Sequence, residues 1–174
     1  MHITPEQKTE LENIYQSFLR DERILKMKEI EMHRGSKCYI HSFKVAKLAI
    51  KRTLRHHKID INIYTVLFAS ILHDYYLYDW RKDRSKMKHH MSNHPYVAAE
   101  NAFKDFSIHE SVRKAIESHM WPVNIGHYPR SIEATIVSNA DKSIYIREIS
   151  CSRKFKAKRE QKYLKQISSL FDEQ

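Results

Sequence analysis

Apolar side chains along most of this chain recur every three or four residues, which is the spacing that places them on one face of an α-helix. The first helix is predicted to run from Pro5 to Leu19, because Thr4 is a suitable N-cap, Pro5 fits the first helical position and Gln7 completes a capping box. The same pattern predicts further helices, with caps or starts at Ser36, Asp60, Asn93, Ser107 and Ser131, and a last one in a basic and then amphipathic segment over 153–172. We therefore expect a single all-α domain over residues 1–174, built as a bundle of about six or seven helices.

The third predicted helix is apolar on nearly all sides from Ile63 to Leu72. A helix without a polar face is normally surrounded by other helices, so we expect it at the centre of the bundle. Its length is about half of what a membrane span requires, and no contact with a membrane is expected. A charged loop is predicted to follow this helix, from Arg81 to His90.

Composition narrows the possible classes of protein. The 174 residues include only two glycines, Gly35 and Gly126, too few for a glycine-rich phosphate-binding loop and unfavourable for hairpin-rich β folds. Two cysteines, Cys38 and Cys151, are too few for a disulfide framework or a zinc ribbon, and no signal-like segment opens the chain. A cytoplasmic location is expected on these grounds.

The chain has a formal net charge of +10 and contains 12 histidines. This combination indicates either metal ligation or contact with polyanions, depending on where the histidines lie. Several histidines and aspartates fall on the apolar, inward faces of the predicted helices. They are His41, His73, Asp74, His94, His119 and Asp141. Burying such groups without partners costs free energy, and a bound metal is the simplest compensation.

Four imidazoles and two carboxylates suit a pair of divalent ions. Iron or manganese fits this mixture of donors, and zinc or magnesium is less favoured. His73 and Asp74 are adjacent and diverge by roughly 100° about the helix axis, so one can hold an ion while the other reaches a second. Any one of these histidines alone would be interpreted as a hydrogen-bonded core residue. It is the set of six that predicts a metal site.

The order of these residues, H…HD…H…H…D, resembles that of the HD superfamily of metal-dependent phosphohydrolases, and the resemblance extends roughly from His33 to Glu148. The local sequences are also similar to those of small stand-alone bacterial HD proteins, and include Leu72-His73-Asp74, His94-Pro95, His119-Met120-Trp121-Pro122 and Ala140-Asp141-Lys142. The resemblance implies a helical bundle with metal at its centre. Because His94 and His119, the two histidines in the middle of this order, are both present, the resemblance implies two ions. A cyclic di-GMP substrate is disfavoured, since Leu77 replaces the lysine found in those phosphodiesterases and no Gly-Tyr-Pro segment follows His119.

The resemblance also suggests roles for individual residues. Asp74 is expected to bridge the two ions and to steer the proton of an attacking water. His41, His73 and Asp141 would complete the first ion site, and His94 and His119 the second. Lys142 and Lys37, and less directly Arg147, are expected to meet phosphate oxygens. His33 and Trp121 are further candidates for substrate binding, and Tyr75, Tyr78 and Trp80 are candidates for stacking on a base.

The predicted function is hydrolysis of a phosphoester or phosphoanhydride bond in a small phosphorylated substrate, with nucleotides as one candidate class. A di-iron oxygenase such as myo-inositol oxygenase uses a similar ligand set and is the second hypothesis. A basic nucleic-acid-binding protein with a structural metal is the third, and it is not favoured. Substrate identity and oligomeric state stay open at this stage.

Overall fold

The computed structural model describes residues 2–32, 36–56, 60–82, 84–150 and 156–171. These residues form eight α-helices and a short 3-10 helix, η1, and the only β pairing among them is an isolated bridge between Glu31 and Lys37. The helices are α1 (Pro5–Arg20), α2 (Glu22–Leu25), η1 (Lys26–Lys28), α3 (Cys38–Leu54), α4 (Ile63–Leu72), α5 (Arg84–Phe106), α6 (Glu110–Glu117), α7 (Ile132–Ile149) and α8 (Lys156–Gln166). The predicted all-α class is confirmed, with slightly more helices than expected.

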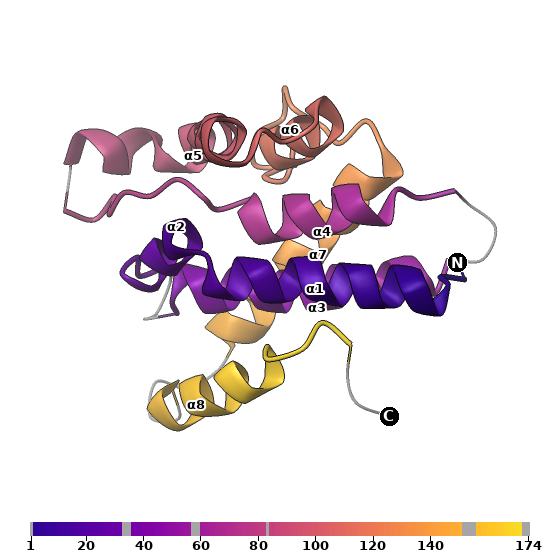
Figure 1. Ribbon diagram of the computed structural model, residues 1–174. Helices are drawn as coiled ribbons and strands as arrows, with labels where there is room; N and C mark the ends of the chain where they lie inside the picture. Colours follow the sequence, from indigo (N-terminus) through magenta and orange to yellow (C-terminus); the bar gives the residue numbers. More distant parts are fainter. Residues whose placement is uncertain (1, 33–35, 57–59, 83, 151–155, 172–174) are drawn as a thin grey trace.

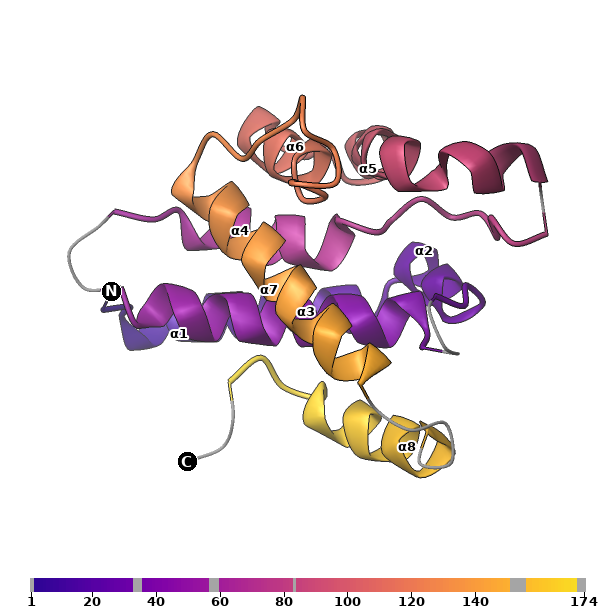
Figure 2. The same ribbon diagram turned by 180° about the vertical axis from the view of Figure 1, so that it is seen from behind.

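The helices stack in layers around α4 (Figure 1). Helix α4 packs against α3 on one side and α6 on the other, and α7 crosses both α3 and α4 obliquely, as Figure 2 shows. Helix α5 pairs with α6, whereas α8 lies on the opposite side of the bundle, next to α3. The prediction that the apolar segment 63–72 is central is therefore confirmed.

The core is continuous from α1 to α7. Helix α1 contributes Tyr15, whose ring meets the ring of Phe43 on α3 edge to face at 5.2 Å between centroids. Tyr15 and Phe43 are fully buried, as is Leu67 in the middle of α4. None of the helices in the described ranges is long and apolar enough to cross a membrane.

Two of the predicted helix starts are confirmed. Thr4 and Gln7 form the expected capping box at α1. Ser131 caps α7, because its side chain accepts a hydrogen bond from the backbone N–H of Ala134.

Three predicted caps are wrong. The cap of α3 is Lys37 rather than Ser36, and that of α4 is Asn62 rather than Asp60. The side chain of Asn62 reaches the N–H of Thr65 at 2.9 Å, so the cap lies directly before the first apolar residue. His109 caps α6, whereas Ser107 occupies the left-handed region with φ 48°.

The prediction of a charged loop at 81–90 followed by a helix from Asn93 is also wrong. Helix α5 begins at Arg84 and passes through Pro95 without ending there. A proline lacks the N–H that would bond to the carbonyl four residues earlier, but the segment before it is rich in Lys, Met and Arg, which are good helix formers. His89 and His90 therefore lie on a helix and not in a loop.

The chain ends were predicted less completely. Helix α2 and η1, directly after α1, were not expected from the sequence. The last segment is helical as predicted, but helix α8 ends at Gln166. The apolar residues Ile167 and Leu170 of this segment follow the helix and are buried.

Candidate metal centre

The six predicted ligands meet at one point inside the bundle. His41 comes from α3, His73 and Asp74 from the end of α4, His94 from α5, His119 from the turn after α6, and Asp141 from α7. The four histidines and Asp74 are all buried, and the side chain of Asp141 is 14% exposed. The set contains three overlapping groups of three residues, and within each group the ligand atoms lie within 4.8 Å of one another. The cluster thus joins five segments that are far apart in the sequence.

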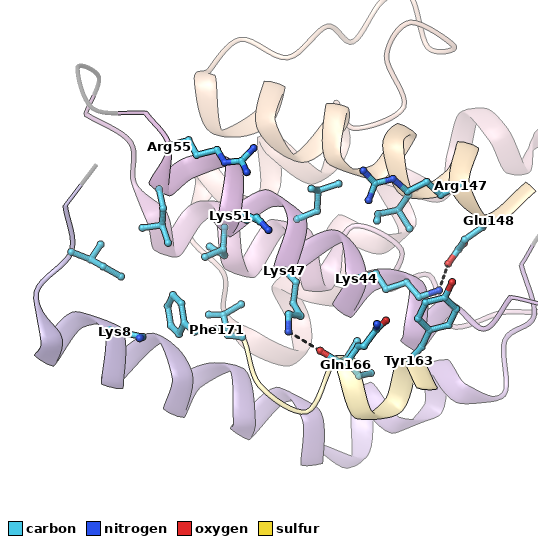
Figure 3. A pocket seen from close by; sticks show the side chains of 17 residues that line it. Lys8, Lys44, Lys47, Lys51, Arg55, Arg147, Glu148, Tyr163, Gln166 and Phe171 are labelled. Carbon is cyan, nitrogen blue, oxygen red and sulfur yellow. Dashed lines mark hydrogen bonds and ion pairs between the residues drawn. The ribbon is translucent and has the colours of Figure 1, made fainter. Parts of the chain in front are cut away.

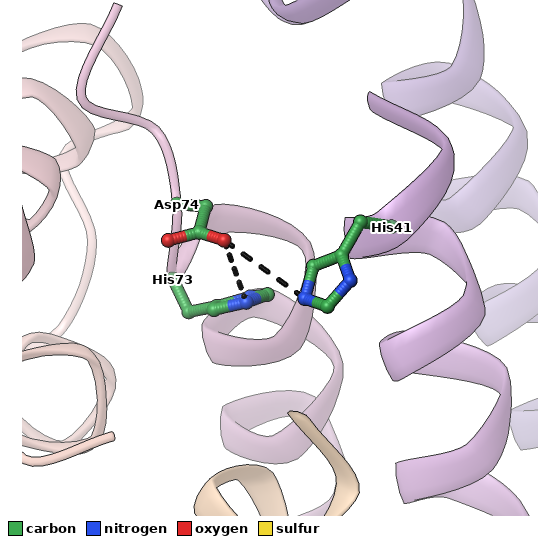
Figure 4. A group of neighbouring side chains, drawn as sticks. All are labelled: His41, His73 and Asp74. Carbon is green, nitrogen blue, oxygen red and sulfur yellow. Dashed lines mark ion pairs between the residues drawn. The ribbon is translucent and has the colours of Figure 1, made fainter. Parts of the chain in front are cut away.

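Asp74 occupies the middle of the cluster. Its Oδ2 lies 3.2 Å from Nε2 of His73 and 3.9 Å from Nε2 of His41, the arrangement drawn in Figure 4. Its Oδ1 lies 3.4 Å from Nε2 of His94 and 3.9 Å from Nε2 of His119. Each carboxylate oxygen therefore faces a different pair of histidines.

Asp141 supplies the second carboxylate. Its Oδ1 lies 3.0 Å from Nε2 of His41 and 3.8 Å from Nε2 of His73. His41 and His73 are consequently flanked by carboxylate oxygens from both α4 and α7. His94 and His119 have Asp74 as their nearer carboxylate.

Backbone carbonyls orient three of the imidazoles. Nδ1 of His73, His94 and His119 lies 2.9, 2.8 and 2.7 Å from the carbonyl oxygens of residues 70, 90 and 116, respectively. A carbonyl oxygen only accepts hydrogen bonds, so Nδ1 must carry the proton in each ring. Nε2 is then left with a lone pair that points into the cluster, which is the tautomer that ligates a metal.

Two features show that the cluster fits a cation. Nε2 of His73 is buried and has no hydrogen-bond partner among the residues that the structure describes. Nε2 of His94 and Nε2 of His119 are only 3.2 Å apart, so two lone pairs face each other. Nε2 of His73 lies 3.2 Å from Oδ2 of Asp74, so in both places acceptor atoms face each other, and a cation between them would relieve the repulsion. Imidazole and carboxylate donors together suit a divalent transition metal.

The electrostatics of the site divide the histidines into two kinds. Burial opposes the charged form of His73, but the Asp74 carboxylate outweighs it and raises the pKa of that ring. Burial lowers the pKa of His41, but hydrogen bonds to the carboxylates of Asp141 and Glu148 outweigh it and raise that pKa to about 10. Burial together with the neighbouring His73 and His94 lowers the pKa of His119 to about 3. Burial also lowers the pKa of His94. His41 is therefore protonated on both ring nitrogens and positively charged in the metal-free protein, whereas His94 and His119 stay neutral.

The two aspartates are ionised. Burial opposes ionisation of Asp141, but the hydrogen bond from His41 and the nearby histidines lower its pKa to about 2. The same opposition holds for Asp74, whose pKa lies well below its usual range because of His73, His94 and His119. The cluster thus holds two carboxylates ready to neutralise a cation.

Glu148 is part of the site and was missed as a functional residue. Its Oε2 lies 3.0 Å from Nδ1 of His41, and its Oε1 accepts a hydrogen bond from Nζ of Lys44 at 2.7 Å. It stands seven residues after Asp141, two helical turns further along the same face of α7. That spacing was the available signal, but a single glutamate near a helix end is usually a solvated residue.

His90, which the sequence predicted to end the charged loop, packs against the site instead. It is buried, and its ring stacks on Trp80 at 4.9 Å and on the ligand candidate His94 at 4.7 Å between centroids. Its Nδ1 is 3.0 Å from the hydroxyl of Tyr78. His90 thus packs behind His94 and contributes its carbonyl to the orientation of that ring.

The structure changes the interpretation of the aromatic residues. Tyr75 is fully buried and donates its hydroxyl hydrogen bond to Asp105, so the suggestion that it stacks on a base is wrong. Trp80 is half-buried against His90, and Trp121 is exposed two residues after His119.

The predicted phosphate-binding residues are spread over the molecule. The ammonium group of Lys142 donates to the carbonyl oxygens of His119 and Ser138 and to the Ser138 hydroxyl, so it ties the His119 turn to α7. Lys37 is half-buried at the start of α3. Arg147 faces a separate cavity beside α8. His33 lies outside the described residues.

Comparison with known proteins agrees with this site. A family model described as HD domain matches residues 38–145, which is more than half of the chain. The protein therefore belongs to the HD domain family, most of whose members are metal-dependent hydrolases. Neither the curated proteins nor the solved structures gave a match. The matched range contains all six ligand candidates and ends before Glu148.

Proposed function

We propose that this protein is a metal-dependent phosphohydrolase that cleaves a phosphoester or phosphoanhydride bond in a small phosphorylated substrate, with nucleotides as one candidate class. The observation that carries the proposal is the position of Asp74, whose two oxygens face two separate pairs of histidines. A single carboxylate placed in this way can join two cations, and two-metal sites are typical of enzymes that hydrolyse phosphate bonds. Membership of the HD domain family supports the same activity.

The ligands divide between the two proposed ion positions. His41, His73 and Asp141 would hold one ion together with Asp74, and His94 and His119 would hold the other with the second oxygen of Asp74. Bound divalent cations lower the pKa of a coordinated water and withdraw charge from the phosphoryl group. The set fits iron or manganese, with zinc or magnesium less favoured.

The chain's own groups have three tasks in this proposal. Asp74 accepts a hydrogen bond from the attacking water and so orients it. Glu148 keeps the ring of His41 in place through Nδ1. Lys142 fixes the turn that carries His119, and a contact between its ammonium group and a substrate phosphate would require it to exchange one of its present acceptors.

Substrate binding outside the ligand set is assigned to residues around the same region. Lys37 begins the helix that carries His41, and Trp121 is exposed two residues after His119. His33 is retained as a proposal from the sequence alone.

The proposal is tested by metal analysis of the purified protein, followed by a screen of phosphorylated compounds with added Mn²⁺ or Fe²⁺. His94→Ala should lower both bound metal and phosphate release. His89→Ala is the matched control, because His89 lies on the same helix but is exposed. Absence of metal under every loading condition would overturn the proposal. Oxygen consumption without phosphate release would identify an oxygenase instead.

A further inference from the structure

A row of cations lies on the face of α3 that points toward α8, as Figure 3 shows. Lys44, Lys47, Lys51 and Arg55 follow one another at spacings of three or four residues, so they share one face of the helix. Like charges at this spacing repel and destabilise a helix by roughly 0.2–0.5 kcal/mol per pair. Such a row is unfavourable for folding, so it calls for an explanation in terms of binding.

The row forms one wall of a cavity of about 800 Å³. This volume is in the range of pockets that hold small organic ligands, which is roughly 300–1,000 Å³. Lys8 of α1 and Arg147 of α7 face the cavity from other sides. Its surface also includes the apolar side chains of Leu48, Leu54, Ile144, Ile167, Leu170 and Phe171. The cavity therefore combines an apolar floor with a cationic rim.

Among the described residues that line this cavity, basic side chains outnumber acidic ones. The one acidic residue among them, Glu148, is already bonded to Lys44 and lies beside His41. Lys51, Arg55 and Arg147 are exposed, and no carboxylate among the described residues forms an ion pair with them. These three cations are free to take up an anion from solution.

We propose that this cavity is a second ligand site, which binds a small organic diphosphate whose remaining part is apolar or aromatic. Its phosphates would lie between Lys51 and Arg55 of α3 and Arg147 of α7, where charge-assisted hydrogen bonds can form. Its apolar part would cover Leu48 and Ile144. The shared chemistry of such a ligand is a diphosphate attached to a hydrophobic group, as in a nucleoside diphosphate or a prenyl diphosphate.

This site is separate from the metal centre. None of the six ligand candidates lines the cavity, although the two sites adjoin at Glu148, which lines the cavity and lies beside His41. The inference rests on the cavity alone. It does not depend on the proposed hydrolase activity.

The test is a calorimetric titration of the full-length protein with three probes whose P–C–P bridge resists hydrolysis. They are methylenediphosphonate, α,β-methylene-ADP and a geranyl methylenediphosphonate. The two organic probes should bind more tightly than methylenediphosphonate, because only they have a group to cover the apolar floor. Tighter binding of the geranyl probe would identify a prenyl-type ligand, and tighter binding of the nucleotide would identify a nucleotide.

Charge reversal locates the binding. The double variant Lys51→Glu/Arg55→Glu should weaken binding of the organic probes at least about tenfold, since each lost charge-assisted contact is worth roughly that factor. The double variant Lys88→Glu/Lys104→Glu is the matched control, because it changes the net charge equally on α5, on the far side of the bundle. Its affinity should stay within about twofold of wild type.

Two results would overturn the proposal. One is equal affinity of the wild type and Lys51→Glu/Arg55→Glu, with binding then assigned to the metal centre. The other is equal affinity for methylenediphosphonate and both organic probes, which would show a general attraction of anions. Circular dichroism of both double variants verifies that they are folded. All four substituted side chains are exposed, so folding should be retained.

Discussion

The candidate metal centre and the cationic cavity adjoin each other beside α3 and differ in how their charged groups are paired. In the metal centre, carboxylates and imidazoles are buried together and each charged group faces a partner of the other kind. In the cavity, cations gather around an apolar floor, and Lys51, Arg55 and Arg147 form no ion pair with a carboxylate among the described residues. The buried carboxylates and imidazoles suit a cation, and the exposed ammonium and guanidinium groups suit an anion. Helix α3 contributes to both, with His41 in the first and the row of cations in the second.

Removing the bridging carboxylate should have the largest effect on this contrast. Asp74→Asn keeps the shape of the side chain but takes away its charge, so both proposed ion positions lose a ligand. We expect bound metal to fall to near zero and phosphate release to fall by roughly 10³-fold, equivalent to several kcal/mol of transition-state stabilisation. Metal analysis and initial rates measure this. Asp60→Asn, at an exposed aspartate, should change neither.

Substituting Glu148 should separate positioning from ligation. Glu148→Gln loses the charge that holds both His41 and Lys44, and residues that orient metal ligands typically contribute 10- to 100-fold to metal affinity. We expect weaker metal binding by roughly that factor, with most of kcat recovered at saturating metal. Glu117→Gln removes a surface ion pair with Arg113 and should leave metal affinity unchanged. Unaltered affinity in Glu148→Gln would show that Glu148 has no positioning role.

The stability of the metal-free protein should depend on pH because His41 is charged in the folded state. The folded-state pKa of His41 is about 10, above its ordinary value of 6.5, so its ion pairs stabilise the fold fully below pH 6.5 and this contribution is lost as pH rises toward 10. His41→Gln should therefore flatten the fall in stability over that interval. Urea unfolding at pH 6.5, 8 and 9.5 without metal measures it. Parallel profiles for the variant and wild type would contradict the assignment.

The charge of His41 should also affect metal binding, but in the opposite sense, because it should weaken metal affinity at low pH. A metal ligand must be deprotonated, so binding must release the proton of His41. Metal affinity is accordingly expected to rise with pH between 6.5 and 9. Titrations in buffers of different ionisation enthalpy would detect the released proton.

The smallest expected effect concerns the cavity. Lys51→Glu replaces the repulsion between Lys51 and its neighbours Lys47 and Arg55 by attraction, so the fold should gain a few tenths of a kcal/mol. Urea unfolding at low and high salt measures the gain, which should shrink at high salt. Loss of stability in this variant would show that the row of cations is part of the structural framework and carries no repulsion.

The sequence predicted the clustering of the six ligand candidates better than the surroundings of that cluster. The inward faces of α3, α4 and α7 place His41, Asp74 and Asp141 toward the core, because helical periodicity fixes direction as well as element type. Glu148 escaped detection because its role depends on the crossing of α7 over α3, which no local pattern contains. The same crossing forms the cavity, so the row on α3 could be seen in the sequence only as a solvated face.

Helix starts were hard to predict for a related reason. Asn62 and His109 cap their helices although Asp60 and Ser107 are equally good caps by residue type, and the choice depends on packing. Local preference differs little between such caps, so packing decides. A helix start was also predicted at Asn93, but α5 begins at Arg84 because the segment before Pro95 is rich in good helix formers.

Glu148 belongs to both sites at once, with one oxygen on His41 and the other on Lys44 at the cavity wall. Thermodynamic linkage makes any such influence mutual: if an occupant of the cavity draws Lys44 away and alters the affinity for metal, metal must alter the affinity for that occupant by the same factor. A single carboxylate would then couple the binding of a metal cation to the binding of an anionic ligand in the cavity.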